Sequence, residues 1–212
     1  MATERLDRAR VVKTAVDLLD EVGLDGLSLR RLAKELGVQA PALYWHFKNK
    51  DELLEEMVVA ISQEDPVPPP EPGQAWDAWI AMRARMMRAS LNRHRDGAML
   101  AASTRPAPSQ FADLEAELEL MVAAGFSPAE ALRTFIAIGN YVAGFTLDEQ
   151  ADRTRGDIQP TEDDWNEMMD QLAPFPLMRA AMIEVGDPQS DAAFEAGLSY
   201  IIVGIATKLQ GA

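Results

Sequence analysis

The chain has 212 residues, a formal net charge of −14, two histidines and no cysteine. Its length fits one large domain or a small module joined to a larger one, and its 48% hydrophobic content excludes a disordered chain. Without cysteine there are no disulfides, thiol nucleophiles or thiolate metal sites. No apolar run reaches about 18 residues and the N-terminus lacks a signal-peptide pattern, so we expect a cytoplasmic protein that does not contact membranes.

The charge is distributed unevenly along the sequence. Residues 1–50 hold 9 Lys and Arg against 7 Asp and Glu, a balance of +2. Residues 51–212 hold 11 against 27, a balance of −16, and the two parts sum to −14. Because an acidic surface repels DNA, any contact with nucleic acid is expected in the first 50 residues.

The first part of the chain has the pattern of four helices. Apolar residues spaced three and four apart predict helices over about residues 11–22 and 29–36, each ended by glycine. Pro41 is typical of the first turn of a short third helix. Asn49, with a glutamate three residues later, predicts the start of a fourth helix that extends toward residue 65.

The proline-rich stretch 66–73 interrupts the helical pattern, because proline lacks the N–H that a helix interior needs. Beyond it we expect a polar, acidic and mobile connection over residues 154–173. No segment alternates with a period of two, so the predicted fold class is all-α. The helices predicted in this second part cover about residues 76–95, 114–122, 127–153 and 190–209.

The segment from Ser28 to Lys50 combines a helix, a glycine turn and a second short helix. This is the helix-turn-helix arrangement, which places its second helix in the DNA major groove. Aromatic and basic residues at the end of the second helix are suited to phosphate contacts. An ordinary helical hairpin with a Tyr–Trp surface patch has the same spacing, so the spacing alone leaves both interpretations open.

The stretch LYWHFKNK at residues 43–50, followed by Leu53-Leu54, resembles the recognition-helix signature of the tetracycline-repressor (TetR) family of bacterial regulators. The resemblance continues into the second part, where residues 94–98, 104–106 and 125–127 are similar to the tetracycline repressor itself. It implies a transcriptional repressor that grips a palindromic DNA operator as a homodimer and releases it when a small molecule binds.

By this resemblance, ten residues contact DNA. Ala40 and Ala42 can touch thymine methyl groups but cannot hydrogen-bond to bases, so the operator should differ from that of the tetracycline repressor. Arg30 suits a guanine contact and an ordinary surface cation equally well. Leu43 and Phe47 are expected to face the core. The ten residues are Arg30, then Gln39, Ala40, Pro41 and Ala42 in the groove, and Tyr44, Trp45, His46, Lys48 and Lys50 at the phosphates.

The second part is expected to hold the effector between its helices, although many of its apolar side chains simply fill a core. By resemblance, the turn Thr104-Arg105-Pro106 touches the effector and moves when it binds. Met178 and Met182 would form a lid over the pocket of the neighbouring subunit. The complete set that the resemblance implies is Arg83, Met87, Thr104, Arg105, Pro106, Glu117, Leu132, Phe135, Asn140, Asp148, Met178 and Met182.

The sequence departs from the tetracycline repressor where that protein holds its drug as a magnesium chelate. Ala101 stands in place of the metal-binding histidine, and Asp148 in place of a glutamate. Because alanine cannot coordinate a metal, we expect no cofactor and no protein metal site, with a magnesium-chelated ligand as the less favoured alternative. The expected effector is a small, largely apolar molecule, either tetracycline-like or of another multi-ring kind. Asp148, Glu149 and Asp152 could gather a hard cation, but a solvated acidic helix end is the better interpretation. We interpret His94 as a structural residue with satisfied hydrogen bonds.

Two long helices, 127–150 and 190–209, predict the homodimer. Both carry small residues that permit close helix approach across a two-fold axis, although part of each helix fits the core of a single chain. The small residues are Gly139, Ala143, Gly197 and Gly204.

We therefore divide the chain into a helix-turn-helix DNA-binding module at 1–50, a connecting helix at 50–65 and a ligand-binding and dimerisation domain at 66–212. An enzyme with Asp148 or Glu117 as a general base is a poor alternative, because neither has a catalytic partner in the sequence. An interaction protein that has lost DNA binding is disfavoured by the intact cluster of aromatic and basic residues.

Overall fold

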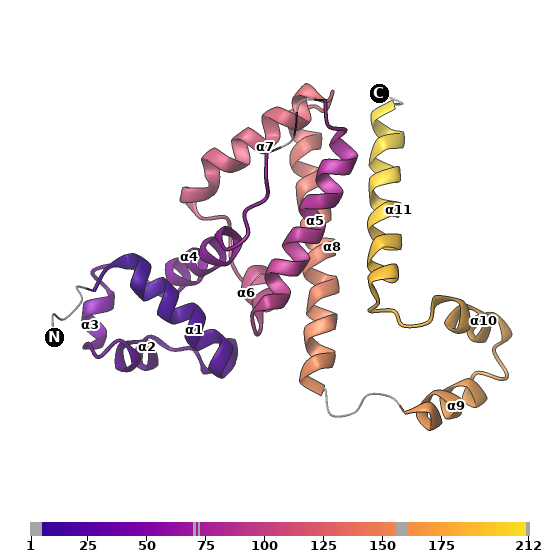
Figure 1. Cartoon of the computed structure of the whole chain (residues 1–212), viewed down its shortest axis with the longest axis horizontal. Coiled ribbons are helices and arrows are strands. Elements are labelled where there is room, and N and C mark those ends of the chain that lie inside the picture. The colour runs from indigo at the N-terminus through magenta and orange to yellow at the C-terminus, as the bar shows by residue number, and fades with distance from the viewer. Residues whose placement is uncertain (1–5, 70, 72, 156–160, 211–212) are drawn as a thin grey trace.

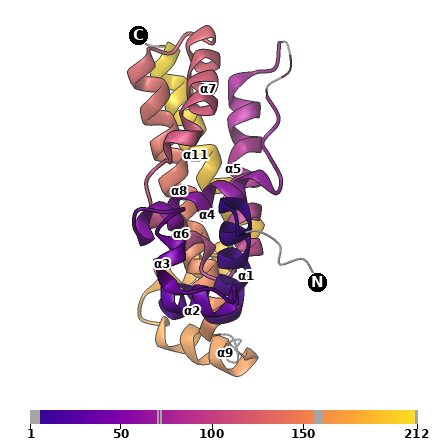
Figure 2. The same ribbon diagram turned by 90° about the vertical axis from the view of Figure 1, so that its left-hand side faces the viewer.

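The structure, a computed structural model, describes residues 6–69, 71, 73–155 and 161–210, and within them the only regular elements are helices (Figure 1). This confirms the predicted all-α fold class. The first four helices form a compact unit at one end, and the long helices of the second part stand beside it (Figure 2).

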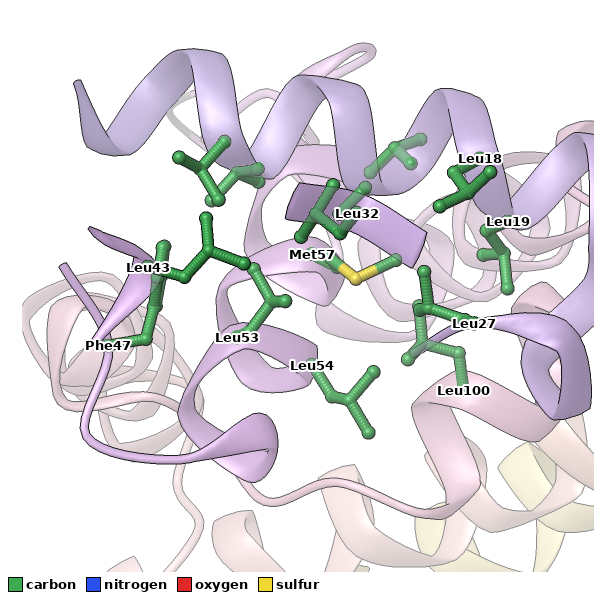
Figure 3. Close-up of a cluster of buried hydrophobic side chains, with 14 of the residues drawn as sticks. Leu18, Leu19, Leu27, Leu32, Leu43, Phe47, Leu53, Leu54, Met57 and Leu100 are labelled. Atoms are coloured by element: carbon green, nitrogen blue, oxygen red, sulfur yellow. The ribbon is translucent and has the colours of Figure 1, made fainter. Parts of the chain in front are cut away.

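The predicted DNA-binding module and the predicted connecting helix pack together, and from here on we call them jointly the module. It is built from α1 (Arg8–Gly26), α2 (Leu29–Glu35), α3 (Ala40–Leu43) and the connecting helix α4 (Lys50–Gln63). Their apolar faces meet in one core, which includes the predicted inward residues Leu43 and Phe47 at 1% and 3% exposure (Figure 3). Leu100, which lies far along the chain, also enters this core beside Leu27 (Figure 3). The module is therefore packed directly against the second part, where α4 contacts both α5 and α6.

Local chemistry fixes the helix ends in the module. The side chain of Ser28 accepts a hydrogen bond from the N–H of Arg31 at 3.2 Å, and Asn49 caps α4 in the same way. Gly37 ends α2 with a φ of 68°, a backbone conformation that glycine adopts without strain. Gly23 has a φ of 71°, and α1 kinks there before one further turn instead of ending as predicted.

The second part, which we call the body, has a separate apolar core formed by its long helices. Helices α5 and α8 lie side by side, α7 leans against α8, and α11 packs along both α5 and α8 (Figure 1). The short α6 follows α5 and contacts α4, α5 and α8. The elements are α5 (Trp76–Arg93), α6 (Gly97–Ala102), the 3-10 turn η1 (Pro108–Gln110), α7 (Phe111–Ala123), α8 (Pro128–Arg155) and α11 (Asp191–Gln210).

The polar, acidic connection predicted over residues 154–173 contains a regular helix that the sequence analysis does not predict, and its mobility stays a prediction. Residues 156–160 lie outside the described part, but α9 (Glu162–Gln171) follows directly, and α10 (Pro176–Val185) comes next. Thr161 and Asp164 form a reciprocal capping box, in which each side chain bonds the other's backbone N–H at 3.2 and 2.7 Å. Both helices extend away from α8 and α11 (Figure 1).

Helix α11 corrects the expectation that no apolar run is long enough for a membrane span. Residues Asp191–Leu209 have a mean hydropathy of 1.4 over a spanning window, and only 11% of that window is buried within the chain. Such a helix is weak support for a membrane segment on its own, since core helices of soluble proteins can have the same length and hydropathy.

Candidate DNA-binding face and effector site

The helix-turn-helix geometry follows from three short-range features of residues 28–43. Ser28 starts α2, Gly37 turns the chain, and the N–H of Val38 bonds to the carbonyl of Ala33 at 2.9 Å to close the turn. Pro41 lies in the first turn of α3, as predicted. Because α3 is anchored by Leu43, its opposite side faces away from the core.

The residues predicted to contact DNA are mostly exposed. Trp45 is 88% exposed and Tyr44 58%, which is unusual for large aromatic side chains in a monomeric protein. Four of the ten are half-buried, namely Ala40, Ala42, His46 and Lys50. The others are exposed as well, namely Arg30, Gln39, Pro41 and Lys48. Exposed aromatic side chains beside basic ones are typical of a nucleic-acid contact surface.

Arg8, which the sequence analysis did not single out, holds this face in place. Its guanidinium bonds Glu52 and Glu56 on α4, each at 3.0 Å, and lies 4.4 Å from the ring centre of Phe47. It also donates to the backbone carbonyl of His46. The start of α1 is thereby tied to the end of the recognition segment. No local motif marks Arg8 for this role, because its partners are about 40 residues away.

Lys50 differs from the other predicted phosphate contacts. Its ammonium donates to the backbone carbonyl of Leu27 at 2.9 Å, so it ties the start of α4 to the connection between α1 and α2. Lys48 remains exposed at the side chain, while its N–H donates to Glu52 at 2.8 Å. The Lys50 ammonium therefore already has a partner within the module, whereas the Lys48 side chain is exposed.

Three of the predicted effector residues meet in the body. The guanidinium of Arg83 on α5 pairs with the carboxylate of Glu117 on α7, with the closest N–O separation at 3.0 Å, and it lies 5.1 Å from the ring centre of Phe135 on α8. The Arg83 and Glu117 side chains are only 18% and 20% exposed. A half-buried ion pair thus joins three helices where the resemblance places the effector.

The remaining predicted effector residues are spread over the body. Thr104 is half-buried and its hydroxyl donates to the carbonyl of Ala101 at 3.2 Å, whereas Arg105 and Pro106 are exposed. Met87 and Met182 are half-buried, and the exposed set comprises Leu132, Asn140, Asp148 and Met178. Met178 and Met182 lie on α10, which extends away from the other body helices of the same chain (Figure 1).

The interpretation of the α8 acidic end as solvated is wrong for Glu149. Its carboxylate pairs with Arg88 at 2.6 Å and accepts a bond from Asn92 at 2.7 Å, and its side chain is 10% exposed. Burial raises the pKa of Glu149, but the bonds from Arg88 and Asn92 outweigh that effect and lower it. Among the described residues, no three His, Asp or Glu side chains gather as a metal-binding group.

His94 has the structural role that the sequence predicts. Its Nδ1 lies 3.0 Å from Asp20 and its Nε2 lies 3.0 Å from Glu64. Both ring nitrogens therefore have partners, and both partners belong to the DNA-binding module.

The surface of α8 and α11 carries large exposed apolar side chains, Leu132 and Ile136 on α8 and Tyr200 and Val203 on α11, each at least half exposed. A side chain at Gly139 or Gly204 would meet nothing within 4 Å in this chain. Gly197 is different, because an added Cβ would lie 2.3 Å from the hydroxyl of Tyr141. Gly197 therefore accommodates a contact within the chain and not, as predicted, the approach of a second copy.

Taken together, a helix-turn-helix with exposed aromatic and basic residues and a helical body with its own core define a DNA-binding regulator of transcription. The chain belongs to the TetR family of bacterial regulatory proteins. The family model "Bacterial regulatory proteins, tetR family" matches residues 11–57, and "Tetracyclin repressor-like, C-terminal domain" matches residues 69–209. The resemblance found in the sequence is confirmed over both parts of the chain.

Known proteins with similar sequences and structures support this assignment. The tetracycline repressor protein class A from transposon 1721 of Escherichia coli is 38% identical over 206 residues, 96% of this chain and 92% of the relative. A structure of class A TetR with 5a,6-anhydrotetracycline and magnesium is 32% identical with a TM-score of 0.69, covering 95% and 99% of the two chains. The Streptomyces coelicolor TetR family protein ActR in complex with actinorhodin is 29% identical with a TM-score of 0.77, covering 97% and 99%.

Proposed function

We propose that the chain acts in the cytoplasm as a repressor that binds a palindromic operator through the exposed face of its helix-turn-helix. The exposure of Trp45 and Tyr44 carries this proposal, because neither side chain contributes to the core and both directly follow the recognition helix. Arg30 and Gln39 would contact bases, and Ala40, Pro41 and Ala42 would line the groove beside thymine methyl groups. Lys48, with Tyr44, Trp45, His46 and Lys50, would hold the phosphates.

The homodimer that operator binding requires would form through α8 and α11. Leu132, Ile136, Tyr200 and Val203 offer the apolar surface, and two copies would bring the recognition helices about one turn of DNA, roughly 34 Å, apart. In sedimentation, the chain should have twice its 23.3 kDa mass. Val203→Asp should leave a monomer, because the dimer would bury an unpaired charge. Val122→Asp, on the exposed side of α7, is the matched control and should remain dimeric.

The effector would bind in the body between α5, α7 and α8, beside Arg83, Glu117 and Phe135. Further contacts to the effector would come from Met87, Leu132 and the Thr104-Arg105-Pro106 turn. Polar contacts would come from Asn140 and Asp148. The effector would be covered by Met178 and Met182 of the partner subunit. An apolar, multi-ring molecule fits these residue types.

A magnesium chelate of the kind bound by class A TetR does not fit the residues present. Ala101 has no donor atom, Glu149 is held by Arg88, and Asp148 is exposed to solvent. The effector would therefore be held by the side chains alone, and we assign the chain no cofactor and no catalytic step.

The DNA-binding proposal is tested with a fluorescent duplex that spans the region upstream of the gene. We expect salt-sensitive binding of the dimer to one palindrome within it and much weaker binding to a scrambled duplex. Failure to bind any part of the upstream region at low salt would overturn the repressor assignment for this chain.

A further inference from the structure

The turn between α5 and α6, residues 94–96, lies against the DNA-binding module. The Nδ1 of His94 is 3.0 Å from Asp20 near the end of α1, and its Nε2 is 3.0 Å from Glu64 at the end of α4. The His94 side chain is only 10% exposed. One imidazole ring from the body thus connects two helices of the module.

The backbone around this turn is shaped for close contact. The N–H of Leu24 donates to Asp96 at 2.8 Å, and a Cβ at Gly23 would lie 2.6 Å from the same carboxylate. Only glycine, which also tolerates the φ of 71° found at position 23, allows this approach. The body therefore contacts the module at a defined position and not through a loose linker.

The protonation state of His94 decides how many of its two contacts are hydrogen bonds. A neutral imidazole has one N–H, so one ring nitrogen would direct a lone pair at a carboxylate oxygen 3.0 Å away. The imidazolium has two N–H groups and donates to both carboxylates. Two carboxylate partners on opposite sides of a buried ring are therefore satisfied together only by the charged form.

The other charged groups at this contact come from α1, from the end of α4, and from the end of α5 with the turn that follows it. On the α1 side, Asp20 also accepts from the N–H of Arg95 at 2.9 Å, and the guanidinium of Arg95 donates to the carbonyl of Glu21 at 3.2 Å. The body thus places Arg95, a second basic residue, beside Asp20, the carboxylate that faces Nδ1 of His94.

On the α4 side, Arg93 lies 3.6 Å from Glu64 and 3.7 Å from Asp65. Burial lowers the pKa of His94, but the hydrogen bonds to Glu64 and Asp20 raise it by more, so its pKa lies above the ordinary histidine value. The hydrogen bonds and negative charges of Asp20 and Glu64 therefore favour the imidazolium, although Arg93 and Arg95 lie nearby.

We propose that His94 is a positioning residue for operator binding: its imidazolium fixes the ends of α1 and α4 to the body, and loss of the proton loosens the module. The predicted effect on operator affinity rests on the proposed function, whereas the proton-dependent contact between His94 and the module does not. The contribution to stability is present below the ordinary histidine pKa and is lost as the pH rises through the raised one. A loosened module must be ordered again on DNA, so operator affinity should fall as the pH rises.

The contact is tested first without DNA. The chain has two histidines, so His46→Gln leaves His94 as the only histidine signal in a proton NMR titration from about pH 5 to about pH 9. We expect a His94 pKa above the ordinary value, and a value at or below it in Asp20→Asn and in Glu64→Gln, where burial then dominates. Asp17→Asn, on the same helix but paired with Lys13, is the control and should leave the pKa unchanged.

The consequence for DNA is tested at constant salt in the natural chain, because His46 is itself a proposed phosphate contact, and is given by the difference between the natural chain and His94→Gln. Affinity for the upstream duplex should fall by about fivefold more in the natural chain than in His94→Gln between about pH 6 and about pH 8.5, over the range in which the NMR signal reports deprotonation. His94→Gln, checked for folding by its NMR spectrum, should bind without this added dependence. An unshifted or lowered His94 pKa, carboxylate variants without effect, or an equal pH profile in His94→Gln would overturn the inference. If no duplex binds at any pH, the repressor assignment fails, while the titration still tests the proton-dependent contact.

Discussion

The DNA-binding module and the body are stabilised in different ways. In the module, leucine, valine and methionine side chains from four helices fill one close-packed cluster (Figure 3). The ion pairs of Arg8 with Glu52 and Glu56 lie at its edge, where the Arg8 side chain is 41% exposed. In the body, half-buried charges cross between helices, as in the pairs Arg83–Glu117 and Arg88–Glu149. A close-packed apolar cluster resists rearrangement, whereas an ion pair can exchange a partner for a polar ligand. The difference indicates a rigid DNA-contacting unit joined to a body that can respond to a small molecule.

The strongest test of this contrast is Leu43→Ala. Leu43 is 1% exposed and anchors the recognition helix, so its truncation should destabilise the module by roughly 3 kcal/mol. Operator binding should be lost in a band-shift assay while effector binding by the body persists. Leu177→Ala, at an 87% exposed position on α10, is the control and should change neither. Equal loss of both activities in Leu43→Ala would show that the two cores do not behave separately.

A smaller effect is expected from Glu149→Gln in the body. The substitution leaves the guanidinium of Arg88 half-buried with only Asp191 as a carboxylate partner, which should cost about 2 kcal/mol. The lowered pKa of Glu149 gives a stabilisation that is present above the ordinary glutamate pKa and is lost as the pH falls through the lowered value. Chemical denaturation at several pH values should therefore show an acid-dependent loss in the natural chain that Glu149→Gln lacks. The exposed Glu119→Gln is the control, and the same acid profile in both variants would contradict the role of the pair.

The sequence predicts the module better than the body, and the reason is the range of the interactions. Ser28, Gly37, Pro41 and Asn49 each act on residues a few positions away, so their caps and turns can be identified from local patterns. The hydrogen bonds of Arg8 to the His46 carbonyl and to Glu56 join residues 38 and 48 positions apart, so no local pattern predicts them.

The same argument explains the errors in the body. The partners Arg88 and Glu149 are 61 positions apart, so the acidic end of α8 looked solvated from composition alone. Gly197 looked like an interface residue because the ring of Tyr141, which needs the space, comes from another helix. The Thr161 capping box at the start of α9 is different, because it is a local pattern that predicts a helix start.

Trp45→Ala separates DNA binding from folding. Because the side chain is 88% exposed, its removal should change the unfolding free energy by less than about 0.5 kcal/mol. Operator affinity should nevertheless fall by about tenfold, about 1.4 kcal/mol, if the indole packs on the DNA backbone. Fluorescence anisotropy with the upstream duplex measures the affinity, and thermal unfolding provides the control. Unchanged affinity would remove Trp45 from the contact surface.

The smallest expected effect concerns the basic residues. Lys48→Ala should lower the slope of log affinity against log salt by about one, with a similar loss on all DNA sequences, because one phosphate contact disappears. Lys50→Ala should also reduce stability, since its ammonium bonds the carbonyl of Leu27. Anisotropy titrations at several salt concentrations distinguish the two variants. An unchanged slope in Lys48→Ala would place the phosphate contact elsewhere.

The most direct test of the whole account is release of DNA from a preformed complex. The dimer bound to a fluorescent upstream duplex is titrated with tetracycline and with a panel of apolar multi-ring compounds, each in EDTA and in millimolar magnesium. We predict that at least one multi-ring compound releases the duplex equally well in both buffers, and that magnesium gives tetracycline no advantage. Release by tetracycline that requires magnesium would contradict the account, because it would mean that other residues replace the missing donor at Ala101.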